Sequence, residues 1–155
     1  MVDKNNDSHQ IDVVCIHDSG VFVLEVKNVC GYEIQCGNEL KYWTYKWVKD
    51  KKLIECKIYN PIWQNDTHCQ QVRRILDNDY PVYSVVVFSN NNKLISDEPL
   101  NEVVLKLNQV ADHLSKFPKR LSEADKQRIK TIIEKNNRTD ISLKEHVDSI
   151  RRRFY

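Results

Sequence analysis

The sequence predicts an α/β protein, in which helices pack against a β-sheet of mixed strand direction. Three observations predict this class. Short apolar runs separated by turn residues recur between positions 11 and 58, as expected of strands. A further apolar run over 81–88 has the length of a buried strand. In the remaining segments, apolar residues recur with the spacing of a helix.

Two apolar runs near the N-terminus predict the first β-hairpin. They cover 11–17 and 21–27, and an Asp-Ser-Gly turn signal lies between them. A two-residue loop at Ser19-Gly20 would pair Asp18 with Val21. Both strands carry apolar residues on both faces, so we expect them at the centre of the sheet, covered on both sides.

A second hairpin is predicted over 41–48 and 51–58, around Asp50. Its strands are rich in Tyr and Trp, as strands often are. We expect these aromatic side chains on the sheet surface and in the core, although Trp43 or Trp47 could stack on a nucleic-acid base.

Asn60 and Pro61 predict the start of a helix, as its cap and its first helical residue. The helix should run to about Asp77, because apolar residues recur along it at helical spacing. A polar stripe runs alongside the apolar one. Its members are Gln64, His68 and Gln71.

Three more helices are predicted after the strand over 81–88. Apolar positions between 100 and 117 fit the helical template closely. Ser122 and Ser142 each precede an acidic residue by three positions, a pairing typical of helix N-termini. The first of these two helices should cover 122–136.

Composition indicates one ordinary globular domain. The chain has 155 residues, 41% of them hydrophobic and 30% charged, with a formal net charge of +2. That charge neither establishes nor excludes a nucleic-acid partner. No apolar stretch is long enough to span a membrane, and the polar N-terminus lacks a signal-peptide core. We therefore expect a cytoplasmic protein with no membrane association.

The five cysteines agree with a reducing compartment. Their number is odd, and no two of them form a C-x-x-C pair. A zinc site from four of them is conceivable, but their spacing is not typical of one. We expect free thiols that bind no metal. The residues are Cys15, Cys30, Cys36, Cys56 and Cys69.

Charged residues at the ends of the first two strands are the strongest functional signal. Asp12 lies within the first apolar run, and Glu25 and Lys27 close the second. Buried charges are costly unless they are paired or bound to a metal. The hairpin register places Asp12 opposite Lys27 and diagonal to Glu25, all on one face. We expect the three to converge on a divalent cation; a structural ion pair between Asp12 and Lys27 is the alternative.

Several motifs occur together along the chain. They are Gln10–Val14, Ser19–Asn28 with Gly31 just after it, Trp47, Asn60-Pro61, Gln64-Asn65 and His68. Together they resemble the NERD (nuclease-related) domain of the PD-(D/E)XK nuclease superfamily. The resemblance spans 9–117 and leaves 118–155 as an appended helical segment. It implies a restriction-endonuclease-like mixed sheet flanked by helices, with extra C-terminal helices and a shortened N-terminus.

The resemblance implies a nuclease that hydrolyses DNA phosphodiester bonds with Mg²⁺ or Mn²⁺. Asp12 and Glu25 would hold the metal, with the Val26 carbonyl as a further ligand, which suits the preference of magnesium for oxygen. Lys27 would position or activate the attacking water and stabilise phosphate charge. Gln64 sits where related nucleases carry a helix glutamine near the active site.

Candidate contacts to the DNA itself are basic side chains on and near the predicted helix. We assign His68, Arg73 and Arg74 to nucleic-acid binding, because basic side chains neutralise phosphates. The alternative is that these side chains only form the solvated face of the helix.

The start of the chain departs from the family pattern. Family members usually begin with a helix bearing a Gly-Glu motif and a strand, whereas ten residues precede Ile11 here. We expect an exposed apolar surface or sheet edge, covered by a homodimer. The alternative is that the helices over 100–117 and 122–136 fold back and cover this surface. The departure also favours two alternatives to an active enzyme on the same fold: a catalytically weak DNA-binding module and a protein-interaction domain.

Overall fold

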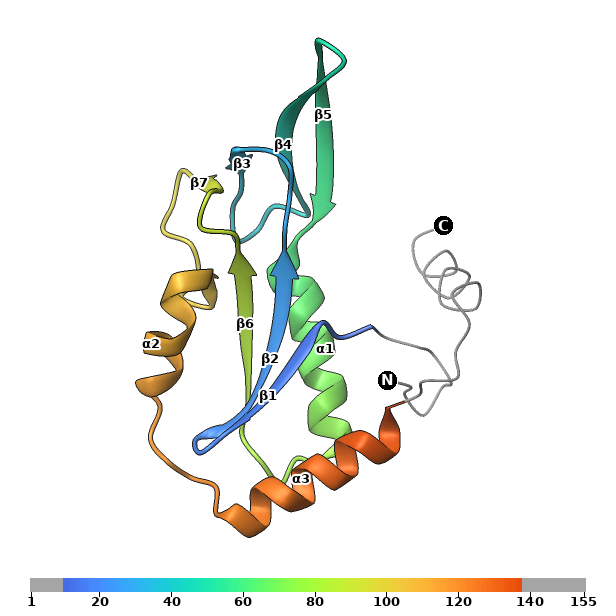
Figure 1. Ribbon diagram of the computed structural model, residues 1–155, viewed down its shortest axis with the longest axis vertical. Helices are drawn as coiled ribbons and strands as arrows, with labels where there is room; N and C mark the ends of the chain where they lie inside the picture. Colours follow the sequence, from blue (N-terminus) through green and yellow to red (C-terminus); the bar gives the residue numbers. More distant parts are fainter. Residues whose placement is uncertain (1–9, 138–155) are drawn as a thin grey trace.

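The computed structural model describes residues 10–137. The described part forms two mixed β-sheets flanked by helices (Figure 1). The strands are β1 (Val13–His17), β2 (Gly20–Lys27), β3 (Glu33–Gln35), β4 (Tyr42–Lys49), β5 (Lys52–Tyr59), β6 (Val82–Phe88), β7 (Lys93–Ile95) and β8 (Val104–Lys106). The helices are α1 (Pro61–Ile75), α2 (Val110–Ser115) and α3 (Glu123–Asn136), and a 3₁₀ turn over Leu107–Gln109 precedes α2. This is the α/β class that the sequence predicts.

The first sheet has the strand order β1-β2-β6-β8. β1 pairs antiparallel with β2, whereas β2–β6 and β6–β8 are parallel pairs. β2 is central and buried, as predicted. The prediction of a central β1 is wrong, because β1 is an edge strand of the described sheet and Val13 is 43% exposed.

The first hairpin is shifted by two residues from the predicted register. Its loop is Asp18-Ser19, and His17 pairs with Gly20, so Asp18 does not pair with Val21. Glycine is required at position 20 by the backbone conformation and by a close neighbour, and not by the two-residue loop. It has φ of +152°, and a Cβ there would lie 2.7 Å from the carbonyl oxygen of Pro81. Because side chains alternate with period two, a slip of two residues leaves each side chain on its predicted face.

The second sheet has the order β5-β4-β3-β7 and contains the predicted aromatic hairpin. Trp43 is completely buried, stacks on Phe88 at 5.7 Å between ring centroids, and donates its ring N–H to the Gly37 carbonyl at 2.9 Å. This confirms Trp43 as a core residue and excludes it as a platform for a base. Figure 1 shows the β4–β5 ribbon projecting beyond the rest of the described fold.

The helix predicted over 100–117 is wrong in its first half. Residues 104–106 form β8, which pairs in parallel with β6, and α2 covers only 110–115. Val86 pairs with Val104, so an apolar run that suits a helix instead forms a half-buried edge strand of the sheet. The short strands β3 and β7 also escaped prediction, because three residues give too little periodicity to recognise.

α1 and α3 cover one face of the first sheet. α1 begins at Pro61 after the Asn60 cap, as predicted; it packs against β2 and β6, and Figure 1 shows it behind β1 and β2. α3 has the predicted Ser122–Asp125 capping box, and its Ile129 is completely buried against this core. The alternative to a homodimer, that the helix over 122–136 covers the sheet, is confirmed for this face. The helix predicted from Ser142 lies outside the described residues.

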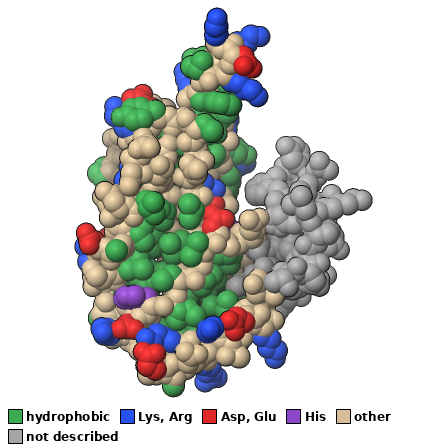
Figure 2. Space-filling view, viewed as in Figure 1, with side chains coloured by type: hydrophobic (Ala, Val, Ile, Leu, Met, Phe, Trp, Pro, Cys, Tyr) green, Lys and Arg blue, Asp and Glu red, His purple; other side chains and the backbone are tan. Residues whose placement is uncertain are grey.

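The other face of the first sheet is only partly covered. α2 packs Leu114 against Phe22 and Val85 at one side of it. Over β1, β2 and β6, Figure 2 shows hydrophobic side chains gathered on the surface, and Val13 and Val26 are 43% and 44% exposed. The apolar surface expected from the sequence is therefore present, but on this face.

None of the helices in the described part of the chain is long and apolar enough to span a membrane. The five cysteines are free thiols, as predicted. Among the described residues, no three His, Cys, Asp or Glu side chains are grouped so that they could hold a metal, so the cysteine zinc site is not formed.

Self-association through the exposed face of β1 and β2 stays a prediction. Burying Val13 and Val26 against a second copy would remove apolar surface from water. We expect sedimentation at micromolar concentration to give twice the monomer mass of 18.4 kDa, and Val13→Lys to shift the mass toward the monomer. A wild-type monomer at that concentration would contradict the dimer.

A second prediction concerns the tie between the hairpin tip and α3. Lys126 and Lys119 lie 2.7 and 3.0 Å from the Asp18 carboxylate, and their hydrogen bonds and charges lower its pKa from 3.8 to about 2. A lowered folded-state pKa gives stability that is present above pH 3.8 and is lost as pH falls toward 2. Urea unfolding should therefore show a steeper loss of stability between these pH values in the wild type than in Asp18→Asn. The same dependence of stability on pH in the wild type and in Asp18→Asn would contradict this prediction.

Candidate functional site

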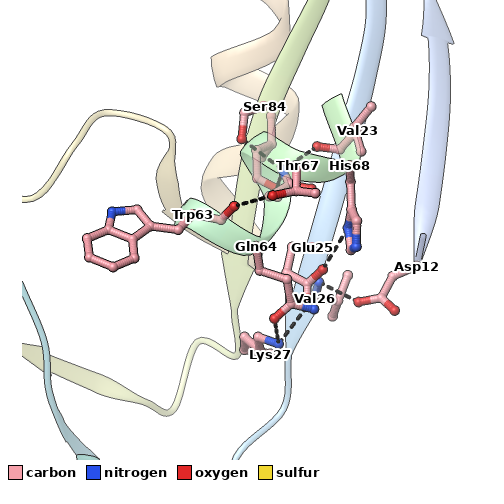
Figure 3. A network of polar contacts seen from close by, with 12 residues as sticks. Asp12, Val23, Glu25, Val26, Lys27, Trp63, Gln64, Thr67, His68 and Ser84 are labelled. Atoms are coloured by element: carbon pink, nitrogen blue, oxygen red, sulfur yellow. Dashed lines mark hydrogen bonds and ion pairs between the residues drawn. The ribbon is translucent and has the colours of Figure 1, made fainter. Parts of the chain in front are cut away.

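The charged residues of the first hairpin meet α1 at one end of the first sheet. Glu25 and Lys27 lie at the C-terminal end of β2, on the face that packs against α1. Asp12 lies just before β1, which runs antiparallel to β2, and so is at the same end. Gln64 and His68 reach this end from α1, and Figure 3 shows the five side chains around the end of β2.

A continuous set of polar contacts joins β2 to α1. The Lys27 ammonium donates to Glu25 Oε1 at 2.5 Å and to Gln64 Oε1 at 3.1 Å. Lys27 is partly accessible, whereas Glu25 is only 3% exposed. The Lys27 ammonium therefore holds the Glu25 carboxylate in the interior, and Gln64 on α1 fixes the position of that ammonium.

His68 approaches the second oxygen of the same carboxylate. Its Nδ1 lies 3.4 Å from Glu25 Oε2, and both side chains are buried. Burial by itself raises the pKa of Glu25, but the hydrogen bonds and charges of His68 and Lys27 outweigh it and hold the pKa below its ordinary value. Glu25 is therefore ionised at neutral pH. A carboxylate oxygen has two lone pairs, so Oε2 can accept a further partner beside His68.

Asp12 is connected to β2 through the backbone. Its Oδ2 accepts the Val26 N–H at 2.9 Å, which extends the β1–β2 pairing beyond the last strand residue. Continuing the ladder from Val13 and Leu24 places Asp12 level with Glu25, not opposite Lys27 as the predicted register had it. Lys27 forms its ion pair with Glu25, so the alternative pair between Asp12 and Lys27 is not what the structure contains. Asp12 is exposed, which leaves its carboxylate accessible from solvent.

Asn65 holds α1 against the strands that carry the site. Its side chain is completely buried, and its Nδ2 donates to the Val23 carbonyl and to Ser84 Oγ, both at 2.8 Å. These bonds fix α1 on β2 and β6 at the residue that follows Gln64. The sequence marked Asn65 only as part of a motif, because a buried amide cannot be told from a solvated one by helical spacing.

Asn60 fixes the start of the same helix. Its Oδ1 accepts the Ile62 N–H at 3.0 Å, as a helix cap does, and its Nδ2 donates to the carbonyls of Asn38 and Leu40 at 2.9 and 2.8 Å. One buried side chain therefore joins the first turn of α1 to the loop before β4. Gln64 lies one turn further along the helix.

The three candidate DNA contacts do not lie together. His68 is buried against Glu25, so it has little surface for a nucleic acid. Arg73 donates to the Val82 carbonyl at 2.8 Å, at the start of β6. Glu25 pairs with Val86, four residues along that strand, which corresponds to about 13 Å. Arg73 and its exposed neighbour Arg74 therefore lie away from the Glu25 end of the sheet.

The oxygen atoms at this end suit a hard divalent cation. Glu25 supplies a buried, ionised carboxylate with spare acceptor capacity, and Asp12 supplies an accessible one just before the adjacent strand. Two protein carboxylates match the way magnesium is bound, since it keeps several waters or phosphate oxygens in its shell. The donor set fits this ion better than zinc, which is held mainly by nitrogen and sulfur.

A mixed sheet flanked by helices, with an acid and a lysine two residues apart at the end of a central strand, defines a restriction-endonuclease-like α/β domain. The model of the family NERD, the nuclease-related domain, matches residues 1–89, and the chain belongs to this family. α2 and α3 follow the matched residues. Comparison with curated proteins gave no significant match, and comparison with solved structures gave none either.

The position of α1 can be tested at Asn65. Asn65→Asp keeps the shape of the side chain but removes the donor to Val23 and Ser84 and places a carboxylate beside a carbonyl. Unmatched buried polar groups cost about 1–3 kcal/mol each, so we expect a loss of about 2–4 kcal/mol in urea unfolding. The control is Gln70→Glu, the same change of amide to acid at an exposed position of α1. Equal stability of the two variants would contradict the role of Asn65.

Proposed function

We propose that the protein is a metal-dependent nuclease that hydrolyses phosphodiester bonds in DNA. One observation carries the proposal: a buried, ionised Glu25 is joined to Lys27 at a sheet end that also holds Asp12. Membership of the nuclease-related family supports the class of reaction. DNA as the substrate and hydrolysis as the reaction are inferences from this chemistry.

Asp12 and Glu25 are the residues that would hold Mg²⁺ or Mn²⁺, with the carbonyl of Val26, which directly follows Glu25 in the sequence, as a further oxygen ligand. When bound, such an ion polarises the phosphate and lowers the pKa of a coordinated water. Asp12 is already oriented by the Val26 N–H, so one short segment arranges both carboxylates.

Lys27 supplies positive charge next to the carboxylates. Its ammonium is partly accessible and is held by Gln64 as well as by Glu25. A cation fixed in this way stabilises charge that develops on phosphate oxygens, without having to reorganise during the reaction. Gln64 acts through Lys27, which it holds in place, so we assign it as a positioning residue. This role agrees with the place near the active site that the resemblance implies.

His68 acts on the opposite side of Glu25. A side chain buried 3.4 Å from Oε2 restricts rotation of the carboxylate. The carboxylate then presents a defined orientation to a cation, and less rotamer entropy is lost on binding. We assign His68 to positioning Glu25, in place of contact with nucleic acid.

One observation favours a second candidate, a catalytically weak DNA-binding module on the same fold. The Lys27 ammonium lies against Glu25 Oε1, so a cation that uses this oxygen must displace or share it. Two carboxylates with a competing lysine bind metal weakly until phosphate oxygens complete the shell. The two candidates predict the same fold and differ in whether cleavage occurs.

Cleavage of circular and linear DNA in Mg²⁺, Mn²⁺ or EDTA tests the function. We expect cleavage with either metal and none in EDTA. Lys27→Ala should lower the rate at least about 100-fold, because an electrostatic donor is removed from the transition state. Lys130→Ala, an exposed lysine of α3, is the control and should cleave normally. Wild-type cleavage that persists in EDTA, or that Lys27→Ala leaves intact, would count against the proposal.

The same proposal makes a statement about metal binding. Glu25→Gln keeps the shape of the side chain and removes its charge, so calorimetry should show a large loss of Mn²⁺ affinity. Lys130→Ala should bind as the wild type does. Equal Mn²⁺ affinity in wild type and Glu25→Gln would refute Glu25 as a ligand, whatever the cleavage result.

A further inference from the structure

The β4–β5 ribbon is long, regular and projects from the fold. Its two strands pair through eight positions, from Tyr42 with Tyr59 to Lys49 with Lys52. At about 3.3 Å per residue the ribbon extends for about 25 Å. Asp50 and Lys51 close it with φ of 50° and 63°, as in the two-residue turns that match strand twist. Figure 1 shows that the distal half stands away from the sheets and helices.

The ribbon is strongly basic. Between 46 and 57 it carries five lysines and two acids. One ion pair forms within it, Lys46 with Glu55 at 4.0 Å. Lys49, Lys51 and Lys52 make no ion pair with any described residue, and Figure 2 shows positively charged side chains concentrated at the tip. Ion pairing within the described fold therefore does not account for these lysines, which concentrate positive charge at one projecting point.

An exposed apolar pair lies just behind the tip. Val48 and Leu53 face each other across the two strands, and each is 66% exposed. Lys46 and Glu55 precede this pair on the same face. Lys49 and Lys52 lie on the opposite face, so positive charge is present on both sides of the ribbon. Apolar side chains with lysines on either side of them suit a surface that alternates base edges with phosphates.

The base of the ribbon is close to the candidate site. β5 continues directly into α1 through Asn60, whose side chain holds the loop before β4. Gln64, which contacts Lys27, is one turn into that helix. A molecule bound along the ribbon is therefore directed toward the end of β2 that carries Glu25 and Lys27.

We propose that the β4–β5 ribbon is an arm that binds duplex DNA, with its lysines on phosphates and Val48 and Leu53 against the groove. This inference rests on the proposed function for the nature of the substrate. The major groove admits a two-stranded β-ribbon, and the lysines on both faces match the two phosphate backbones that border it. An anionic membrane fits less well, because the charged turn residues Asp50 and Lys51 lie beyond the apolar pair, so Val48 and Leu53 could enter a bilayer only behind these charges.

Fluorescence anisotropy with a labelled 20-base-pair duplex in EDTA measures binding without cleavage. The test variant is Lys49→Gln/Lys51→Gln/Lys52→Gln. The matched control is Lys116→Gln/Lys130→Gln/Lys135→Gln, which removes the same charge from exposed positions elsewhere. We expect the ribbon variant to lose affinity at least about tenfold and its log–log salt slope to fall by about 2–3, and the control to change little. Matching thermal melts show that both variants are folded.

Three results would overturn the arm. Equal losses of duplex affinity in both variants would show that only net charge attracts the DNA. No loss in the ribbon variant would show that the ribbon does not bind the duplex. Loss of binding to phosphatidylserine vesicles, with duplex affinity unchanged, would assign the ribbon to a membrane surface.

The cleavage assay keeps this inference separate from the proposed function. Ribbon-dependent duplex binding by a protein that cleaves nothing supports the arm and overturns the nuclease. Cleavage that depends on Lys27, in a protein whose duplex affinity does not depend on the ribbon, supports the nuclease and overturns the arm.

Discussion

Burial of the Glu25 carboxylate is the constraint on which the arrangement of this fold depends. A carboxylate that is 3% exposed stays ionised only where other groups offset its lost hydration. Lys27 does so from the same strand and His68 from α1, so strand and helix must meet at one register. The charged site therefore also determines how the helix lies on the sheet, in addition to the apolar contacts that drive packing.

Two buried amides set that register. Asn60 joins the start of α1 to the loop before β4, and Asn65 joins its second turn to β2 and β6. Between them they place Gln64 within reach of Lys27. A single helix thus connects three parts of the molecule: the projecting ribbon, the central strands and the charged end of β2. This continuity places the proposed DNA-binding arm and the candidate site on one structural unit, so a ligand held by the ribbon would be directed toward Glu25.

The two faces of the first sheet are covered differently. α1 and α3 close one face, and α3 brings Ile129 into its core from beyond the residues that match the family. The opposite face receives only α2 at one side and keeps apolar side chains of β1 and β2 partly exposed. The candidate site at the end of β2 consequently lies between a face covered by helices and a face that keeps apolar side chains partly exposed.

The sequence by itself determined the fold class, the first hairpin, the aromatic hairpin, α1, α3 and the family, because apolar periodicity and caps are local signals. It also singled out Asp12, Glu25 and Lys27 as candidate site residues, because charge at the end of an apolar strand is unusual, and it added Gln64 through the resemblance to the nuclease-related domain. Tertiary structure decided the two-residue slip of the hairpin, where Gly20 must pass close to Pro81. It also decided that 104–106 is a strand, since pairing with β6 outweighs local helical spacing. Finally, it decided the partners of His68 and Asn65, because a polar stripe on a helix becomes solvated or buried according to what packs against it.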